Sequence, residues 1–441
     1  MKSKTFRLPP RRVDLDKAIA LHRAGRLDEA RRIYDQILGA EPGNASVWHF
    51  LGVLEHQKGN SDQGVANITR ALELDPRYAD ACNNLGNIYR ETNQYDAALA
   101  AYERAIAIAP RHADAWNNLG VMRSGRGDYV AAEQAYVRAV ELDPMHVAAW
   151  QNRASLAARA EQFDTSIAAY RRAIELRPGD THAYNGLSRL LYRCGRIDEA
   201  VAVYNEWLAV DPENAVARHM MAACLGTAAP ERASDAFVRD IFNAFAGSFE
   251  QVLDQLGYRA PALISDCLDR VRPAADAALV VADAGCGTGL CADFLRRRAR
   301  RLVGVDLSAG MLARARARKA YDELIEGELA SWLAGRSEEF DLIVSADTLC
   351  YFGALEQALA GAANALRPGG LVVFTVERAT GDVTDFHLDA TGRYSHAEDY
   401  VRGVLAASGL ESIAIEHVVL RRERGQEVKG LLAHACRRAG P

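Results

Sequence analysis

The chain has 441 residues, which is enough for two or three domains with a sizeable core in each. Hydrophobic residues make up 49% of it and charged residues 25%, proportions that are ordinary for a soluble globular protein. The formal net charge of −5 gives no case for nucleic acid or an acidic surface as the main partner.

Targeting and metal-binding patterns are not found. The first dozen residues are basic but contain no apolar stretch, so no secretory signal is expected. No run of about 18 apolar residues occurs, and no membrane partner is expected. The eight cysteines are scattered, without the paired spacing of a zinc site or the density of a disulfide-rich secreted protein. We therefore expect a cytoplasmic protein with reduced thiols and no bound metal.

Prolines in the N-terminal half recur at a fixed interval of 34 residues. They are Pro42, Pro76, Pro110, Pro144, Pro178 and Pro212. Each is expected to follow a helix, because proline cannot continue the helical hydrogen-bond ladder. Apolar residues spaced three and four apart predict amphipathic helices between the prolines. Small residues that let paired helices approach lie at Gly52, Gly86, Gly120 and Ala154.

A 34-residue unit of two helices resembles the tetratricopeptide repeat. The resemblance covers nearly half of the chain and predicts six repeats from about 11 to 214, with a capping helix at 215–225. The first repeat is degenerate, as terminal repeats often are. Such a solenoid presents a concave surface that usually binds a partner segment.

Three consecutive repeats carry an asparagine at the same place, at Asn84, Asn118 and Asn152. This resembles the repeats of O-GlcNAc transferases, in which an asparagine ladder on the inner face hydrogen-bonds an extended peptide. The resemblance implies that the concave face binds a peptide or protein, since a side-chain amide offers both donors and an acceptor. The ladder is interrupted at Phe50 and Gly186, and no glycosyltransferase segment follows. The alternative is that these asparagines cap turns or are polar surface.

Strands and helices alternate in the C-terminal half, which predicts a mostly parallel sheet covered on both faces. A run of helices is expected over 237–268. The expected later helices cover 290–300, 309–320, 354–366 and 396–408. The expected strands cover 279–284, 301–306, 324–326, 340–346, 370–377, 411–420 and 430–438. The last two strands are expected to pair as an antiparallel hairpin.

A glycine-rich segment follows the first of these strands, in the order Asp283-x-Gly285-x-Gly287-x-Gly289. Glycine at these positions removes the side chains that would keep a ligand away from the backbone. A dinucleotide site requires G-x-G-x-x-G or alanine, but counting from Gly285 places Leu290 at the third position. The spacing therefore does not favour a dinucleotide.

The parallel sheet with its terminal hairpin resembles the Rossmann-like class I S-adenosylmethionine-dependent methyltransferases, over about 235–441. The glycine motif followed by D-L-S-x-x-M-L resembles the ubiquinone-type members. The resemblance implies a site for S-adenosylmethionine that includes Asp283, Gly285, Cys286, Gly287, Gly289, Asp306, Leu307 and Met311. The carboxylate of Asp306 would accept hydrogen bonds from both hydroxyl groups of the ribose. Glu328 matches, more loosely, the position of the family's aspartate that contacts the adenine amine.

The implied reaction is displacement at the cofactor's methyl carbon, for which the enzyme aligns an acceptor atom. Amide and adenine-amine methyltransferases carry an Asn/Asp-Pro-Pro-Tyr/Phe motif where this chain has 346–351, and the motif is missing. The paired glutamates of protein arginine methyltransferases are missing too. An O-, S-, C- or simple N-methyltransferase remains.

Candidate catalytic residues on the acceptor side are Asp347, Tyr351 and His396, with His387 and Tyr394 as further possibilities. Ser395 and Glu398 are spaced as a capping box, which predicts that His396 lies in the first turn of a helix. There it would be a neutral base or would only pack the turn.

Two short segments, 257–261 and 392–400, resemble bacterial proteins predicted to be methyltransferases fused to tetratricopeptide repeats. In these proteins the leading helices would close over the cofactor. The resemblance implies a lid role for Tyr258 and Arg259. The basic run at 296–301 is expected to offset a helix dipole and lie along the surface rather than bind nucleic acid.

We expect three parts: a repeat solenoid at 11–225, a linker with lid helices at 226–278, and a methyltransferase domain at 279–441. The expected function is methylation of a peptide or protein held by the repeats. One alternative is a small-molecule methyltransferase whose repeats serve scaffolding or homodimer formation. The other is an adaptor that binds the cofactor without turnover.

Overall fold

The computed structural model describes residues 15–226, 229–273, 277–423 and 425–439. Contacts divide the chain into two compact units, Met1–Cys194 and Gly195–Pro441, and each is described by itself. The boundary falls inside the sixth predicted repeat, so that its second helix belongs to the second unit. Among the described residues, no helix is both long and apolar enough to cross a bilayer.

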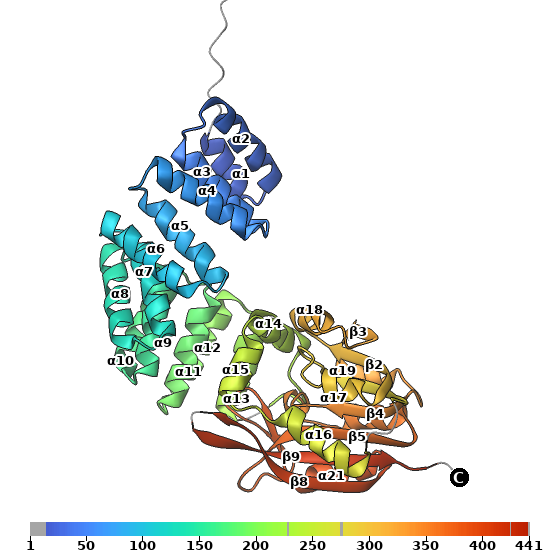
Figure 1. The fold of residues 1–441 in the computed structure, drawn as a ribbon. Coiled ribbons are helices and arrows are strands. Elements are labelled where there is room, and N and C mark those ends of the chain that lie inside the picture. The colour runs from blue at the N-terminus through green and yellow to red at the C-terminus, as the bar shows by residue number, and fades with distance from the viewer. Residues whose placement is uncertain (1–14, 227–228, 274–276, 424, 440–441) are drawn as a thin grey trace, which may run out of the picture. The chain divides into compact units, whose positions relative to one another are not determined.

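Helices in antiparallel pairs follow the predicted 34-residue period (Figure 1). In the first unit they are α1 (Leu15–Arg23), α2 (Leu27–Ala40), α3 (Ala45–Gln57), α4 (Ser61–Leu74), α5 (Ala79–Glu91), α6 (Tyr95–Ile108), α7 (Ala113–Gly125), α8 (Tyr129–Leu142), α9 (Val147–Arg159), α10 (Phe163–Leu176) and α11 (Thr181–Arg193). The second unit begins with α12 (Ile197–Val210) and α13 (Ala215–Leu225). These helices confirm the tetratricopeptide-like fold.

The recurring prolines end the second helix of each repeat. Each lies two residues beyond the last residue of its helix, as Pro76 does after α4 and Pro110 after α6. Indole nitrogens of three repeats donate to proline carbonyls at 2.9–3.0 Å, in the pairs Trp48–Pro42, Trp116–Pro110 and Trp150–Pro144. The same turn is therefore fastened in the same way in different repeats.

Close helix approach explains the small residue in the first helix of each repeat. A Cβ built on Gly86 would lie 2.5 Å from the ring of Tyr102, and one on Gly120 would lie 2.5 Å from that of Tyr136. Both tyrosines are buried. The glycine therefore provides the space that the aromatic ring of the paired helix fills.

The rest of the second unit is an α/β domain preceded by three helices. The helices are α14 (Asp235–Phe245), α15 (Phe249–Gln255), α16 (Ala260–Val271), α17 (Ala292–Arg296), α18 (Ala309–Ala317), α19 (Leu329–Ala334), α20 (Glu356–Ala365) and α21 (Glu398–Ala407), with a 3-10 turn η1 (Leu349–Tyr351). The strands are β1 (Leu279–Ala284), β2 (Ala299–Asp306), β3 (Glu323–Glu326), β4 (Phe340–Ser345), β5 (Leu366–Arg378), β6 (Phe386–Leu388), β7 (Tyr394–His396), β8 (Leu410–Glu423) and β9 (Gln426–Arg437).

These strands form one mixed sheet in the order β3-β2-β1-β4-β5-β7-β6. Strands β1 to β5 are parallel, whereas β9 pairs antiparallel with both β5 and β8. The strand order reverses between β1 and β4, which is where open α/β sheets bind ligands beyond the carboxyl ends of the strands. The predicted terminal hairpin is confirmed as β8–β9.

Helices cover both faces of the sheet (Figure 1). Apolar residues of α16 and α17 pack on one face, against Val281, Leu342 and Val373. Those of α19, α20 and α21 pack on the other, against Val280, Ile343 and further strand residues. Alternate residues of a strand point to opposite faces, so strands buried on both faces are apolar throughout.

The predicted start of α21, at His396, is wrong. Ser395 and His396 belong to the short strand β7, and α21 begins only at Glu398. The residue preceding the helix is Ala397, whose methyl side chain cannot accept a hydrogen bond, so the predicted capping box does not form. The short β6–β7 hairpin is also not predicted by the sequence, because its strands have only three residues each.

Candidate functional site

The glycine-rich loop connects the end of β1 to α17, at the switch point of the sheet. Gly285 has φ +79°, and a Cβ there would lie 2.1 Å from Oγ1 of Thr348 in the segment after β4. Gly287 has φ +54°, and its Cβ would meet nothing within 4 Å. Gly285 therefore lets the glycine-rich loop contact the segment after β4. Gly287 adopts a left-handed conformation, and no other residue lies against the position of its missing Cβ. Gly289 completes the turn, and Cys286 between them is buried.

Asp306 ends β2 directly beside this loop. One of its carboxylate oxygens accepts a hydrogen bond from the amide of Gly287 at 2.9 Å, and the other accepts one from the amide of Ser308 at 2.8 Å. Burial raises the pKa of this carboxyl group, and the backbone hydrogen bonds lower it in part. The carboxylate is thus held in place at the loop, with a second lone pair on each oxygen.

Two further predicted cofactor residues adjoin Asp306. Leu307 is half-buried, and Met311 is buried in the first turn of α18. The amide of Met311 donates to Oγ of Ser308 at 3.1 Å, which caps that helix. The buried side chain of Met311 therefore helps to pack α18, the helix that follows Asp306.

Asp283 lies beneath the loop and is 1% exposed. Its carboxylate accepts a hydrogen bond of 2.6 Å from the phenol of Tyr321. Burial is the main cause that raises the pKa of Asp283 to about 7, and the hydrogen bond from Tyr321 opposes it. Tyr321 is a site residue that the sequence analysis missed, since it lies in the turn before β3 and matches no motif.

Glu328 acts as the N-cap of α19. Its two carboxylate oxygens accept hydrogen bonds from the amides of Ala330 and Ser331, at 2.8 and 2.7 Å. The residue follows β3 at the same edge of the sheet as Asp306. An adenine amine would therefore have to share this carboxylate with the helix terminus.

Asp347, in the segment after β4, has a left-handed backbone with φ +54°. This conformation is unusual for a residue with a side chain and is concentrated at functional sites. Its amide donates to Oγ1 of Thr375 at 2.9 Å. One carboxylate oxygen forms an ion pair of 2.9 Å with Arg421, and the other is buried without a hydrogen-bond partner.

Arg421 is the centre of a buried charge cluster that the sequence analysis missed. Its side chain is 2% exposed and forms ion pairs with Asp347, Glu377 and Glu423. Arg393 pairs with the same two glutamates, at 2.6 and 2.5 Å. Three carboxylates thus meet two guanidinium groups, and burial raises the pKa of Glu377 against the effect of the arginines. The sequence feature that could have predicted this cluster is the presence of charged residues at the ends of the apolar strands β5 and β8.

Aromatic residues lie next to this cluster. The ring of Tyr351 contacts that of Phe242 on α14, edge to face with centroids 5.4 Å apart. Burial, followed by the charge of Asp347, raises the pKa of Tyr258 well above its ordinary value. The amide of Arg259 donates to the carbonyl of Leu420 at 2.8 Å, so the predicted lid segment is joined to β8.

The leading helices contact both ends of α18, the helix that follows Asp306. Oδ1 of Asn243 in α14 accepts hydrogen bonds from Oγ of Ser308 and the amide of Gly310, at 2.7 and 3.1 Å. Glu250 in α15 forms an ion pair with Arg318 at 2.7 Å. These contacts hold α14 and α15 against the helix that follows Asp306.

His396 is fully buried in β7 rather than at a helix end. Its Nε2 lies 2.8 and 3.1 Å from the carbonyl oxygens of Phe352 and Gly353. Burial lowers the pKa of His396 to about 4, so the ring is neutral at physiological pH. With Nε2 as the donor, the ring holds the segment after η1. The further candidates differ: Tyr394 is buried and His387 is exposed.

The basic run at 296–301 is paired with acids of the same unit. Arg296 pairs with Asp322, and Arg301 pairs with Glu323 and Glu339 at 2.7 and 3.0 Å. The run starts at the last residue of α17 and continues into β2, so only its beginning lies at a helix end.

The half-buried asparagines of the repeats connect neighbouring repeats. The amide nitrogen of Asn118 lies 2.9 Å from Oδ1 of Asn83, and that of Asn152 lies 2.9 Å from Oδ1 of Asn117. Asn84 contacts His49 in the same way, at 2.7 Å. The amide nitrogens thus link the repeats.

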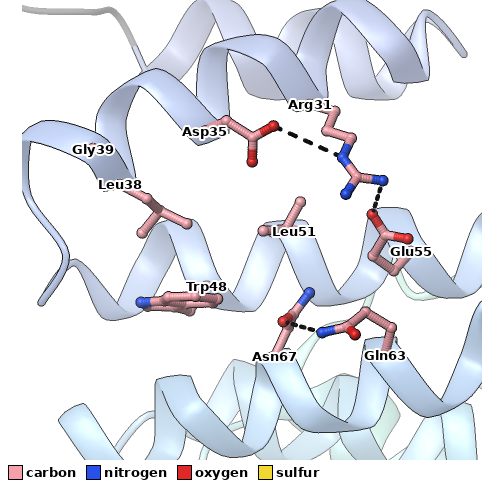
Figure 2. A pocket seen from close by; sticks show the side chains of 9 residues that line it. All are labelled: Arg31, Asp35, Leu38, Gly39, Trp48, Leu51, Glu55, Gln63 and Asn67. Atoms are coloured by element: carbon pink, nitrogen blue, oxygen red, sulfur yellow. Dashed lines mark hydrogen bonds and ion pairs between the residues drawn. The ribbon is translucent and has the colours of Figure 1, made fainter.

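The repeats also contain an open pocket of about 510 Å³ between α2, α3 and α4 (Figure 2). Arg31 crosses it and pairs with Glu55 at 2.6 Å, and Gln63 donates to Asn67 at 2.9 Å. The residues that line it are Arg31, Asp35, Leu38, Gly39, Trp48, Leu51, Glu55, Gln63 and Asn67. None of them belongs to the asparagine ladder.

Comparison with known families matches the repeats and the sheet to different families. Residues 282–374 match the family described as a methyltransferase domain. Residues 11–54 match the tetratricopeptide repeat, and residues 38–246 match the C-terminal domain of cilia and flagella-associated protein 70.

Curated relatives align with parts of the chain. Malonyl-[acyl-carrier protein] O-methyltransferase of Pectobacterium atrosepticum is 34% identical over 131 residues, which is 27% of this chain and 48% of that one. Trans-aconitate 2-methyltransferase of Paracidovorax citrulli is 33% identical over 114 residues, which is 24% of this chain and 44% of that one. The chain thus spans less than half the length of both relatives.

Among solved structures, a Thermotoga maritima S-adenosylmethionine-dependent methyltransferase, described as a possible histamine N-methyltransferase, is 16% identical. The match covers 46% of this chain and all of that one, with a TM-score of 0.35. The family matches thus agree with the observed architecture, in which residues similar to a tetratricopeptide repeat precede residues similar to a methyltransferase domain.

Proposed function

We propose that the protein transfers a methyl group from S-adenosylmethionine to a peptide or protein that its repeats recruit. The observation that carries the proposal is the glycine loop bonded to Asp306 at the switch point of a methyltransferase domain. When bound, the cofactor supplies an electrophilic methyl group. The repeats favour a macromolecular acceptor over a free metabolite.

The residues at the loop fit the cofactor. The uncovered backbone at Gly287 allows close approach, and the carboxylate of Asp306 has lone pairs left for the two ribose hydroxyls. Asp283 lies beneath this loop with a raised pKa. A cationic cofactor bound above it would favour the ionised carboxylate, because opposite charges in a buried site attract strongly.

On the acceptor side, Asp347 and Tyr351 are better placed than His396. The ion pair with Arg421 holds one oxygen of Asp347, and the other oxygen has no partner and can accept a proton or a hydrogen bond from the acceptor. Tyr351 is close enough to Asp347 for the charge of Asp347 to raise its pKa, after the larger effect of burial, and its ring packs against Phe242. His396 would act as a positioning residue, since it bonds the carbonyl groups that follow Tyr351.

A small-molecule acceptor is the second candidate. Two observations favour it: α14 and α15 are bonded to the two ends of α18, beside Asp306, and one relative is named for trans-aconitate. The other relative is named for malonyl-[acyl-carrier protein], an acceptor carried by a protein. That name is compatible with recruitment by the repeats.

The cofactor assignment is tested by calorimetry of S-adenosylmethionine binding to the full chain. We expect Asp306→Ala to weaken binding by about 1.5–3 kcal/mol, roughly tenfold to 150-fold, because a charged hydrogen-bond acceptor is lost. Glu326→Ala, at the exposed end of the neighbouring strand β3, is the matched control and should bind normally. Unchanged affinity in Asp306→Ala would rule out the ribose assignment.

A further inference from the structure

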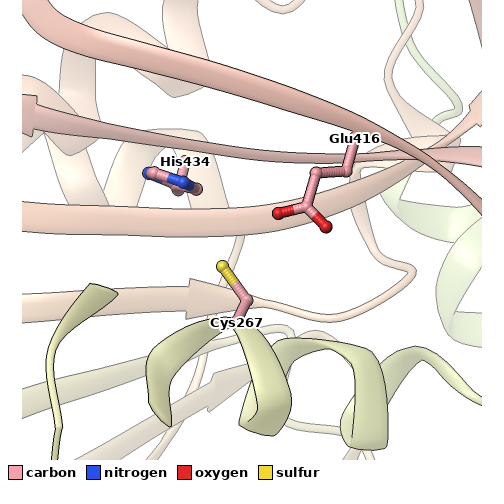
Figure 3. Close-up of side chains that lie close together, drawn as sticks. All are labelled: Cys267, Glu416 and His434. Carbon is pink, nitrogen blue, oxygen red and sulfur yellow. The ribbon is translucent and has the colours of Figure 1, made fainter. Parts of the chain in front are cut away.

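Three side chains with metal-binding atoms meet between α16 and the β8–β9 hairpin. They are Cys267, Glu416 and His434, and one ligand atom from each lies within 4.8 Å of the other two (Figure 3). Among the described residues this is the one group of three or more such side chains with this spacing. It shares no residue with the candidate cofactor site.

The backbone sets the positions of the three residues. In the β8–β9 ladder, Ala414 is opposite His434 and Glu416 is opposite Leu432. Glu416 and His434 are therefore diagonal neighbours on one face of the hairpin. Leu432 on that face belongs to the core that α16 covers, and Cys267 belongs to the same core. The cluster is built on a helix and two strands rather than on loops.

The combination of sulfur, imidazole nitrogen and carboxylate oxygen is typical of Zn²⁺ rather than of Mg²⁺ or Ca²⁺, which prefer oxygen ligands. We propose that Cys267, His434 and Glu416 bind one zinc ion, with water as the fourth ligand. Zinc bonds of about 2.0–2.3 Å place neighbouring ligand atoms about 3.5 Å apart. The cluster must therefore contract slightly, and the long, exposed side chain of Glu416 can provide that movement.

The protonation states of Cys267 and His434 determine which proton is released when zinc binds. Burial raises the pKa of the Cys267 thiol, so without metal it carries its proton at neutral pH. Burial lowers the pKa of His434, so its ring is neutral and can donate a lone pair. Zinc binding forms the sulfur–zinc bond and releases the thiol proton to solvent.

Arg270 opposes the ion. It lies one helical turn after Cys267 and pairs with Glu416 at 2.6 Å. Its charge repels a cation, and its hydrogen bond occupies one carboxylate oxygen. Removing this charge should strengthen metal binding, which is a result opposite in sign to the loss of a ligand.

Bound zinc would join α16 to the β8–β9 hairpin. The segment just before α16 holds Tyr258 and Arg259, whose backbone is already bonded to β8 at Leu420. The ion would therefore stabilise the part of the second unit that supports the predicted lid. The inference does not depend on methyl transfer.

The experiment uses the full chain, reduced and stripped of metal with a chelator. Thermal unfolding is followed on titration with Zn²⁺, and thiolate-to-metal absorption on titration with Co²⁺. We expect a higher Tm with zinc and an absorption band that saturates at one equivalent of cobalt. Cys267→Ser should abolish the band. His434→Ala or Glu416→Gln should weaken metal binding by more than about tenfold, because losing a residue that only hydrogen-bonds a metal ligand already costs about tenfold or more.

Matched variants separate this site from other thiols and imidazoles. Cys436→Ser and His417→Ala, on the same two strands, should bind as the original protein does, and Arg270→Gln should bind more tightly. The absence of a cobalt band, or a band of equal affinity in His434→Ala and Glu416→Gln, would overturn the proposal. Glu416 is exposed, so its variant keeps the test valid even if Cys267→Ser fails to fold.

Discussion

The repeats and the methyltransferase domain are stabilised in different ways. In the repeats, the same contacts return every 34 residues, as in the bonds from Trp116 to Pro110 and from Trp150 to Pro144. In the domain, the important contacts join residues far apart in sequence, as in Asp347 with Arg421. A local change should therefore have a graded effect in the repeats and a large effect in the domain.

The largest effect is expected from Arg421→Met. This change removes the ion pair of Asp347 and leaves Glu377 and Glu423 with Arg393 alone, and breaking a buried ion pair from one side costs about 3–5 kcal/mol. Urea unfolding followed by circular dichroism measures the loss. Arg422→Met is the control: its side chain is 68% exposed, so the loss of its pair with Glu427 should cost at most about 1 kcal/mol. Equal losses in the two variants would contradict the role of the cluster.

A smaller effect is expected from Gly285→Ala. The new Cβ would lie 2.1 Å from Oγ1 of Thr348, and alanine would have to adopt the left-handed backbone of this position. The clash and the backbone strain together should cost about 2–4 kcal/mol. Gly287→Ala has the same backbone strain without the clash and should cost only about 1–2 kcal/mol. Thermal unfolding of both variants gives the comparison. If Gly287→Ala were the more damaging, the proposed contact between the two loops would be wrong.

The smallest effect is expected from Asn118→Ala in the repeats. It removes the hydrogen bonds to Asn83 and Asn87 and should cost about 1–2 kcal/mol, since one hydrogen bond usually contributes about 1 kcal/mol. Gln134→Ala, at an exposed position of α8, should stay within about 0.5 kcal/mol of the original protein. Urea unfolding distinguishes the two. A neutral Asn118→Ala would mean that the ladder does not hold neighbouring repeats together.

The repeats could be predicted from sequence because their information is local. Period, proline position and small residues are all visible within 34 residues, and the helices lie where these features predict. The parallel sheet and its terminal hairpin were predictable for a similar reason, since long apolar strands alternate with amphipathic helices.

The candidate site could be predicted only in part. Asp306 and the glycine loop form a recognisable motif, and they lie together in the structure. Tyr321 and Arg421 match no motif, because their roles depend on partners 38 and 74 residues away. His396 was misplaced since the spacing of a capping box occurs equally well at the end of a short strand.

Transfer of labelled methyl from S-adenosylmethionine into proteins of a cell lysate tests the central claim most directly. The full chain is compared with Asp306→Ala and with a variant in which Asn84, Asn118 and Asn152 are all alanine. We expect label in a protein band that is lost in Asp306→Ala and reduced in the ladder variant, whose affinity for the cofactor is unchanged. Label confined to small molecules, at equal levels in the full chain and the ladder variant, would contradict an acceptor recruited by the repeats.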